Sequence, residues 1–170
     1  MEQQPRVVEV QKRFAAPTLL SLRWRDKMAR SLLQQACSYL AIASFRFKDY
    51  KDDEDHVRIA AYRLQRATEK ALKYLCECRG IRYPKTHQLM LLLSLLSEED
   101  QGKLNVLLPY VSVLTEWEAT TRYGGESSVA YKLVATCIPI VRQVLQTVDD
   151  LTKGVHEPDV HNVLNPMTLE

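Results

Sequence analysis

Glycine is scarce in this chain of 170 residues, which has five glycines and seven prolines. The sequence contains no glycine-rich phosphate loop followed by a lysine, and Gly124-Gly125 is an isolated pair of the kind that ends a helix. It also lacks a serine, histidine and acid in a hydrolase-like arrangement. The sequence alone therefore identifies no self-contained active site.

Long hydrophobic runs are missing as well. The longest apolar block, at about residues 89–96, is shorter than a membrane span, and the first residues lack the apolar run of a signal peptide. Net charge is only +2, from 23 basic and 21 acidic residues, which predicts no strong overall attraction to nucleic acid or membrane. We expect a cytoplasmic protein that does not contact a membrane.

The four cysteines show no metal-binding pattern. Cys76 and Cys78 are two residues apart on a predicted helix and point to nearly opposite sides, so this pair alone cannot share a metal ion. Cys37 and Cys137 lie on apolar helix faces and are typical of small core residues. We predict reduced thiols, no metal and no cofactor.

Amphipathic helices dominate what is present. Apolar residues recur at helical spacing in five segments, at about residues 24–50, 54–79, 87–96, 102–121 and 127–151. Short connections between long helices favour antiparallel neighbours, so the predicted fold is an all-α, up-and-down bundle of about five helices. We expect residues 1–23 to form an N-terminal arm or short extra helix, residues 24–153 the bundle, and residues 154–170 a flexible tail.

The second predicted helix is the most informative segment. Its buried stripe is Ala60, Leu64, Ala67, Ala71, Tyr74 and Cys78. Its opposite face is Tyr62, Arg66, Glu69, Lys70 and Lys73. Glu69 and Lys73 have the spacing of an i,i+4 ion pair, Gly80 is a plausible C-terminal stop, and Pro84 prevents an immediate restart.

Three short motifs, in this order, carry a family resemblance. They are Ala67-Thr68-Glu69-Lys70-Ala71-Leu72-Lys73, then Thr86-His87-Gln88-Leu89, then Arg122-Tyr123. Together they resemble the HEPN family, the higher eukaryote and prokaryote nucleotide-binding domains, over about residues 24–151. The resemblance implies an antiparallel bundle of four or five helices.

The resemblance also implies three kinds of function. Many HEPN domains are partners of minimal nucleotidyltransferases, others bind nucleotides, and a third branch consists of dimeric, metal-independent ribonucleases, often toxins. The ribonucleases place an arginine and a histidine four to six residues apart at the start of a late helix. Here Arg122 occupies the comparable position, but no histidine follows until His156, which argues against a ribonuclease. Arg82 and His87 have a similar spacing in the wrong element, which we treat as coincidence.

Each candidate site residue also has a structural interpretation. His87 is either a phosphate or base contact or a hydrogen-bonded residue beside a helix that Thr86 caps. Arg122 and Tyr123 either bind a ligand or form an ion pair and a packed ring. Glu69, if buried, needs Arg122 or Lys73 as its partner. A modest basic surface is predicted from Lys70, Lys73, Arg79, Arg82 and Lys85.

The resulting hypothesis is a non-catalytic helical module. It binds a nucleotide or RNA, or serves as the substrate-binding partner of a nucleotidyltransferase chain, and it forms a homodimer. The candidate ligand-binding residues are Glu69, Lys70, Lys73, Arg82, Lys85, His87, Arg122 and Tyr123. The alternatives are a dimeric toxin-type ribonuclease with a divergent site and a purely structural interaction module.

Overall fold

The computed structural model describes residues 19–50, 52–123 and 129–153, and these contain helices and no strand. The elements in chain order are α1 (Leu19–Asp49), α2 (Glu54–Cys78), α3 (Leu89–Ser94), α4 (Glu98–Lys103), the 3₁₀ helix η1 (Asn105–Tyr110), α5 (Val111–Tyr123) and α6 (Tyr131–Thr152). The prediction of an all-α fold is confirmed. None of the described helices is long and apolar enough to cross a membrane.

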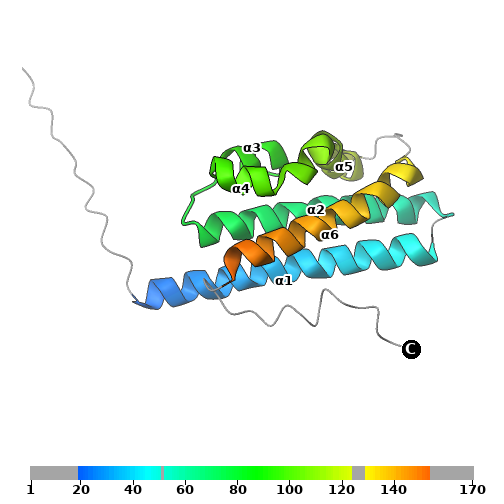
Figure 1. The fold of residues 1–170 in the computed structure, drawn as a ribbon. Coiled ribbons are helices and arrows are strands. Elements are labelled where there is room, and N and C mark those ends of the chain that lie inside the picture. Colours follow the sequence, from blue (N-terminus) through cyan, green and yellow to red (C-terminus); the bar gives the residue numbers. More distant parts are fainter. Residues whose placement is uncertain (1–18, 51, 124–128, 154–170) are drawn as a thin grey trace, which may run out of the picture.

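Helix α2 is the centre of the arrangement. Figure 1 shows α1 and α6 along one side of α2, and α3, α4 and α5 on the other. Its alanines explain the close approach of its neighbours, because Ala60, Ala61, Ala67 and Ala71 are all fully buried. Asp53 starts the helix, and its carboxylate accepts hydrogen bonds from the backbone N–H groups of the next turn.

Helix α2 ends as its sequence predicts. Gly80 has a φ of +69°, in the left-handed region that glycine adopts most readily. The N–H of Gly80 donates to the carbonyl of Glu77 (3.0 Å), and the N–H of Ile81 donates to that of Cys76 (2.9 Å). This pair of bonds is a Schellman motif, which turns the chain towards the segment that contains His87.

The predicted helix at 102–121 is wrong, because three elements replace it. Helix α4 begins earlier, since Ser97 Oγ accepts a hydrogen bond from the N–H of Asp100 (3.2 Å) and caps Glu98–Lys103. Pro109 has no N–H to donate and lies in η1, and α5 continues only from Val111.

The other helix boundaries also differ from the prediction. Helix α1 begins at Leu19 rather than 24, and α6 at Tyr131 rather than 127. Helix α3 begins at Leu89 with Gln88 as its N-cap. Thr86 Oγ1 instead accepts a hydrogen bond from the N–H of Gln88 (3.0 Å), so Thr86 closes a turn and does not cap the helix.

Cys37 and Cys137 are buried, as predicted. The predicted buried stripe of α2 is wrong at its end, because Cys76 is buried and Cys78 is only partly buried. Burial raises the pKa of each of the three buried thiols to about 11, so they stay protonated at neutral pH. Within the described ranges, no three histidine, cysteine or acidic side chains gather as metal ligands do.

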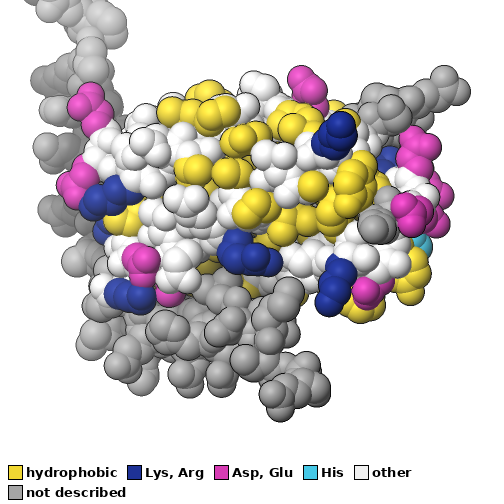
Figure 2. All heavy atoms as spheres, turned by 45° about the vertical axis from the view of Figure 1, so that its right-hand side comes forward, with side chains coloured by type: hydrophobic (Ala, Val, Ile, Leu, Met, Phe, Trp, Pro, Cys, Tyr) yellow, Lys and Arg dark blue, Asp and Glu magenta, His cyan; other side chains and the backbone are white. Residues whose placement is uncertain are grey.

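The surface carries apolar side chains on several elements. The most exposed are Phe45 on α1 (57%), Leu108 on η1 (52%) and Met90 on α3 (51%). Figure 2 shows hydrophobic side chains spread over one face of the molecule, with acidic side chains grouped at its right-hand edge. The three most exposed apolar side chains therefore lie on three different elements and form no single row along one helix.

Candidate functional site

A buried carboxylate lies on the side of α2 that faces the segment leading into α3. Glu69 is only 1% exposed. Its Oε1 accepts a hydrogen bond from Lys73 Nζ at 2.7 Å, and its Oε2 accepts from Arg66 Nη1 and Gln65 Nε2, each at 3.1 Å. The predicted i,i+4 pair with Lys73 is confirmed, but Glu69 lies inside the protein and not on an exposed face.

The same side chains bind the backbone of the following segment. Lys73 Nζ also donates to the carbonyl of Thr86 at 2.9 Å, and Gln65 Nε2 donates to the carbonyl of His87 at 3.3 Å. His87 Nδ1 lies 3.0 Å from Glu69 Oε2. We call Gln65, Arg66, Glu69, Lys73 and His87 the Glu69 cluster. Its hydrogen bonds hold the segment around His87 against α2. His87 thus has the hydrogen-bonded, structural role that was one of its two predicted interpretations.

The tautomer of His87 follows from these contacts. A carboxylate only accepts, so the 3.0 Å contact with Glu69 requires a proton on Nδ1. The Nη1 of Arg66, 3.3 Å from the same Nδ1, is then a close neighbour and not a hydrogen-bond donor to it. His87 Nε2 lies 4.0 Å from Glu118 Oε1 on α5, and the side chain remains 40% exposed. The Nδ1 edge of the ring is thus fixed by Glu69, and the Nε2 edge points towards Glu118.

Glu69 and Arg66 remain charged at neutral pH. Burial alone would raise the pKa of Glu69, but hydrogen bonds from Lys73 and His87 and the charge of Arg66 outweigh it and lower the pKa. Burial likewise opposes the charge of Arg66, yet the Glu69 carboxylate raises the net pKa of that guanidinium. Glu69 is therefore a permanent counter-ion and not a proton donor or acceptor.

Arg79 does not belong to the predicted basic surface. Its Nε and Nη2 donate to the two carboxylate oxygens of Asp100 at 2.8 and 3.0 Å. These hydrogen bonds lower the pKa of Asp100, a residue only 4% exposed. The pair joins the end of α2 to α4, so the charge of Arg79 serves the fold.

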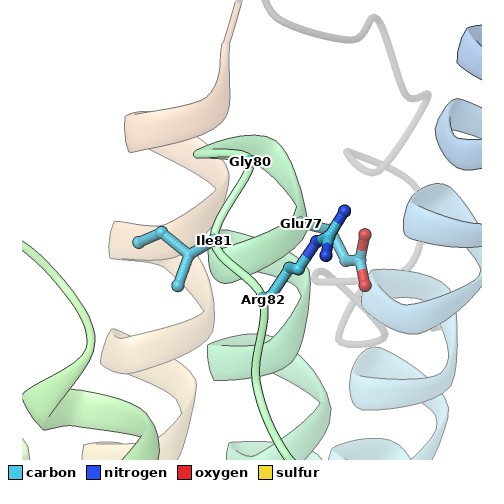
Figure 3. A pocket seen from close by; sticks show the side chains of 4 residues that line it. All are labelled: Glu77, Gly80, Ile81 and Arg82. Atoms are coloured by element: carbon cyan, nitrogen blue, oxygen red, sulfur yellow. The ribbon is translucent and has the colours of Figure 1, made fainter. Parts of the chain in front are cut away.

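Arg82 and Lys85 lie apart from the Glu69 cluster. Arg82 lines a hollow of about 460 Å³ together with Glu77, Gly80 and Ile81. Figure 3 shows the Arg82 side chain alongside Glu77, while Ile81 points the opposite way. Lys85 is exposed in the segment before α3. Arg82 and His87 thus take part in different groups of contacts, which supports treating their spacing as coincidence.

A second group of cations lies where α2 meets α1, and Lys70 is its one member among the candidate residues predicted from the sequence. The Cζ of Arg63 is 5.2 Å from the ring centroid of Tyr39 on α1 and 5.9 Å from that of Tyr62. The Cζ of Arg66 is 6.0 Å from the Tyr39 ring. Nearer the start of α2, Arg46 Nη1 lies 3.0 Å from His56 Nε2.

The sequence signal for this group is a local absence of acids. Residues 27–48 contain no aspartate or glutamate, and residues 56–73 contain only Glu69. The two stretches hold nine lysines and arginines against this one acid, whereas the whole chain is almost balanced. We call Arg46, Arg63 and Lys70, with the rings of Tyr39 and Tyr62, the α1–α2 cation face.

Comparison with known families identifies the fold. The family model of the HEPN domain matches residues 29–151, which is most of the chain. The chain belongs to the HEPN domain family. No curated protein and no solved structure compared with it gave a match.

Two of the three segments that carry the family resemblance meet in the structure. The motif Ala67–Lys73 supplies Glu69 and Lys73, and the motif Thr86–Leu89 supplies the backbone and ring that they hold. Arg122 and Tyr123 belong to the last turn of α5, but their side chains lie outside the described residues. The expected contact of Arg122 with Glu69 stays a prediction.

Proposed function

We propose that this HEPN domain is a non-catalytic module that binds the phosphate groups of a nucleotide at the α1–α2 cation face. The observation that carries the proposal is that Arg46, Arg63 and Lys70 form no ion pair with a carboxylate within the described part of the chain. The sequence around them, residues 27–48 and 56–73, holds nine lysines and arginines against one acid, Glu69, which is buried and already accepts hydrogen bonds at both oxygens. The charges of these three cations therefore remain available to an anion.

Several candidate residues from the sequence fit this role. Lys70 lies on α2 and makes no ion pair within the described part of the chain. His87, whose side chain is 40% exposed, lies beside Arg66 and Lys73, which are 17% and 13% exposed. A phosphate that binds next to these residues meets cations whose positions Glu69 already fixes, which reduces the entropy lost on binding.

The non-catalytic part of the proposal rests on the histidines. Helix α6 contains none, so it cannot supply the arginine and histidine pair that ribonucleases of the family place on a late helix. His87 uses Nδ1 to bind Glu69, and Arg82 lies along Glu77. Arg82 and His87 are therefore not positioned to act together on a substrate.

The test is a thermal-shift series with ATP, GTP, CTP and UTP, with and without Mg²⁺. A ligand that prefers the folded protein raises its melting temperature in a saturable way. We expect such a shift for the wild type, a smaller one for Lys70→Ala, and a wild-type shift for Arg58→Ala, because Arg58 is already paired with Asp55.

The absence of a shift with every nucleotide would contradict the proposal. It would favour the second hypothesis, in which the domain serves a nucleotidyltransferase chain as its substrate-binding partner. Co-purification with such an enzyme would then be the informative measurement. If Lys70→Ala and Arg58→Ala reduced the nucleotide-induced rise in melting temperature equally, the α1–α2 cation face would not be the binding site.

A further inference from the structure

We infer that the α1–α2 cation face binds a single-stranded polynucleotide rather than a single nucleotide. The inference rests on the proposed function, since it names the ligand class of the same side of the molecule. Its support comes from three properties of the face: cations without a direct carboxylate partner, tyrosine rings beside two of them, and a length that exceeds one nucleotide.

The cations of the face lack counter-ions. Among the residues that the structure describes, Arg46, Arg63 and Lys70 form no direct ion pair with a carboxylate. Arg46 contacts an acid only through His56, whose Nδ1 lies 3.4 Å from Asp53 Oδ2. The Nε of Arg63 is buried and has no hydrogen-bond partner there. Because an uncompensated guanidinium has five donors and no acceptor of its own to satisfy them, these groups are suited to an anionic ligand.

Aromatic rings orient these cations. Arg63 lies against the rings of Tyr39 and Tyr62, and the Cζ of Arg46 is 5.9 Å from the ring centroid of Tyr50. A guanidinium that stacks on a ring keeps its N–H edge free for a phosphate. The partly exposed Tyr39 and Tyr62 also offer ring surface on which an unpaired base can stack.

The face is longer than a mononucleotide. Arg46 contacts His56, and Lys70 lies 14 residues further along α2, so the cations extend over about 21 Å of helix. Phosphates of a stacked strand follow one another at about 3.4 Å, and about six nucleotides therefore cover this length. The two tyrosines of the face both lie beside Arg63, between the Arg46 and Lys70 ends, so bases can stack near its middle while phosphates contact the cations on either side.

The experiment is a fluorescence-anisotropy titration of the full chain with labelled oligouridylate and oligothymidylate of about 12 nucleotides. Titrations between about 50 and 200 mM KCl give the salt dependence. We expect both strands to bind more tightly than UTP, with a logarithmic salt slope of about −2 for three phosphate contacts. Equal binding of RNA and DNA points to recognition of phosphates and bases, and tighter binding of RNA adds a contact to the ribose hydroxyl.

Matched variants locate the site. Arg63→Ala should weaken oligonucleotide binding roughly tenfold and reduce the slope by about 0.7, whereas Arg63→Lys should keep the slope and lose part of the affinity. Arg58→Ala, on the same helix but paired with Asp55, should change neither. Tyr62→Leu should weaken oligonucleotide binding and leave the binding of inorganic polyphosphate unchanged.

Three results would overturn the inference. They are oligonucleotide binding no tighter than that of UTP, equal effects of Arg63→Ala and Arg58→Ala, and equal binding of polyglutamate. If nucleotides shift the melting temperature but the strands bind no better, the inference fails and the proposed function stands. If neither nucleotides nor strands bind, both fail.

Discussion

Helix α2 carries cations in two settings that differ in their counter-ions. At the Glu69 cluster, Arg66 and Lys73 share one buried carboxylate, and their hydrogen bonds hold the segment around His87. On the α1–α2 cation face, Arg63 and Lys70 have no carboxylate partner among the described residues, and Arg63 lies beside two tyrosine rings. The same residue types thus stabilise the fold in one setting and remain available to a ligand in the other.

A second comparison isolates the effect of burial. The Lys73–Glu69 and Lys103–Glu99 pairs have the same i,i+4 spacing and nearly the same N–O distance, 2.7 and 2.6 Å. The glutamate side chain is 1% exposed in the first pair and 78% exposed in the second. Although the two pairs have the same geometry, removing the carboxylate of the buried pair should cost far more stability than removing that of the exposed pair.

The largest expected effect is that of Glu69→Gln. The change leaves two cations without their counter-ion and disrupts the contacts to His87, so the free energy of unfolding should fall by about 3 kcal/mol. The value is below that for a fully buried pair because Arg66 and Lys73 can still reach solvent. Urea denaturation measures it.

The control for that experiment is Glu99→Gln, which removes the exposed member of the matched pair. It should cost less than about 1 kcal/mol. If Glu69→Gln and Glu99→Gln lowered the free energy of unfolding equally, the burial of Glu69 would add nothing to stability. The distinction between the two settings would then fail.

Asp100→Asn should have an intermediate effect of about 2 kcal/mol, because Arg79 then loses a bidentate partner at the junction of α2 and α4. Arg79 is 33% exposed, which leaves it partly solvated after the change. The urea midpoint of this variant should lie between those of Glu69→Gln and Glu99→Gln, and a midpoint below that of Glu69→Gln would reverse the predicted order.

Acid should destabilise the protein through the same two carboxylates. The folded-state pKa values of Glu69 and Asp100 lie below their ordinary values of 4.5 and 3.8, so the folded state releases these protons more readily than the unfolded state. Their stabilisation is complete above those ordinary values and is lost as pH falls through the folded-state pKa values. The melting temperature should therefore drop below about pH 4.5. The drop should be smaller in Glu69→Gln, and an identical acid profile would contradict the assignment.

The smallest expected effect on stability is that of Arg63→Ala. The change removes contacts with Tyr39 and Tyr62 but leaves no charge unpaired, and it should cost less than about 1 kcal/mol. Urea denaturation of this variant beside the wild type provides the measurement. A loss as large as that of Glu69→Gln would mean that Arg63 is a structural residue.

Much of the fold could be read from the sequence because it depends on local rules. Helical spacing located α1, α2 and α6, and Gly80 and Pro84 marked the end of α2. Ser97 followed by three acids also predicts the N-terminus of α4. The separation of η1 from α5 could not be predicted, because Pro109 favours a break whose form depends on packing.

The candidate site was predictable only in part. Spacing along one helix predicts the Glu69–Lys73 pair, but the contacts of Gln65 and Lys73 with the backbone at Thr86 and His87 join segments far apart in sequence. The cation face was missed for a different reason. A net charge of +2 averages over the chain and hides two adjacent helical stretches that share a single acid.

The most direct test of this account is the free energy of unfolding of Arg63→Ala and wild type, each measured with and without a saturating oligouridylate. The account predicts nearly equal stability without the strand, and a gain on its addition that is large for the wild type and reduced in the variant. A variant that is strongly destabilised without the strand, yet gains as much from it as the wild type, would contradict the division of α2 into structural and ligand-binding charges.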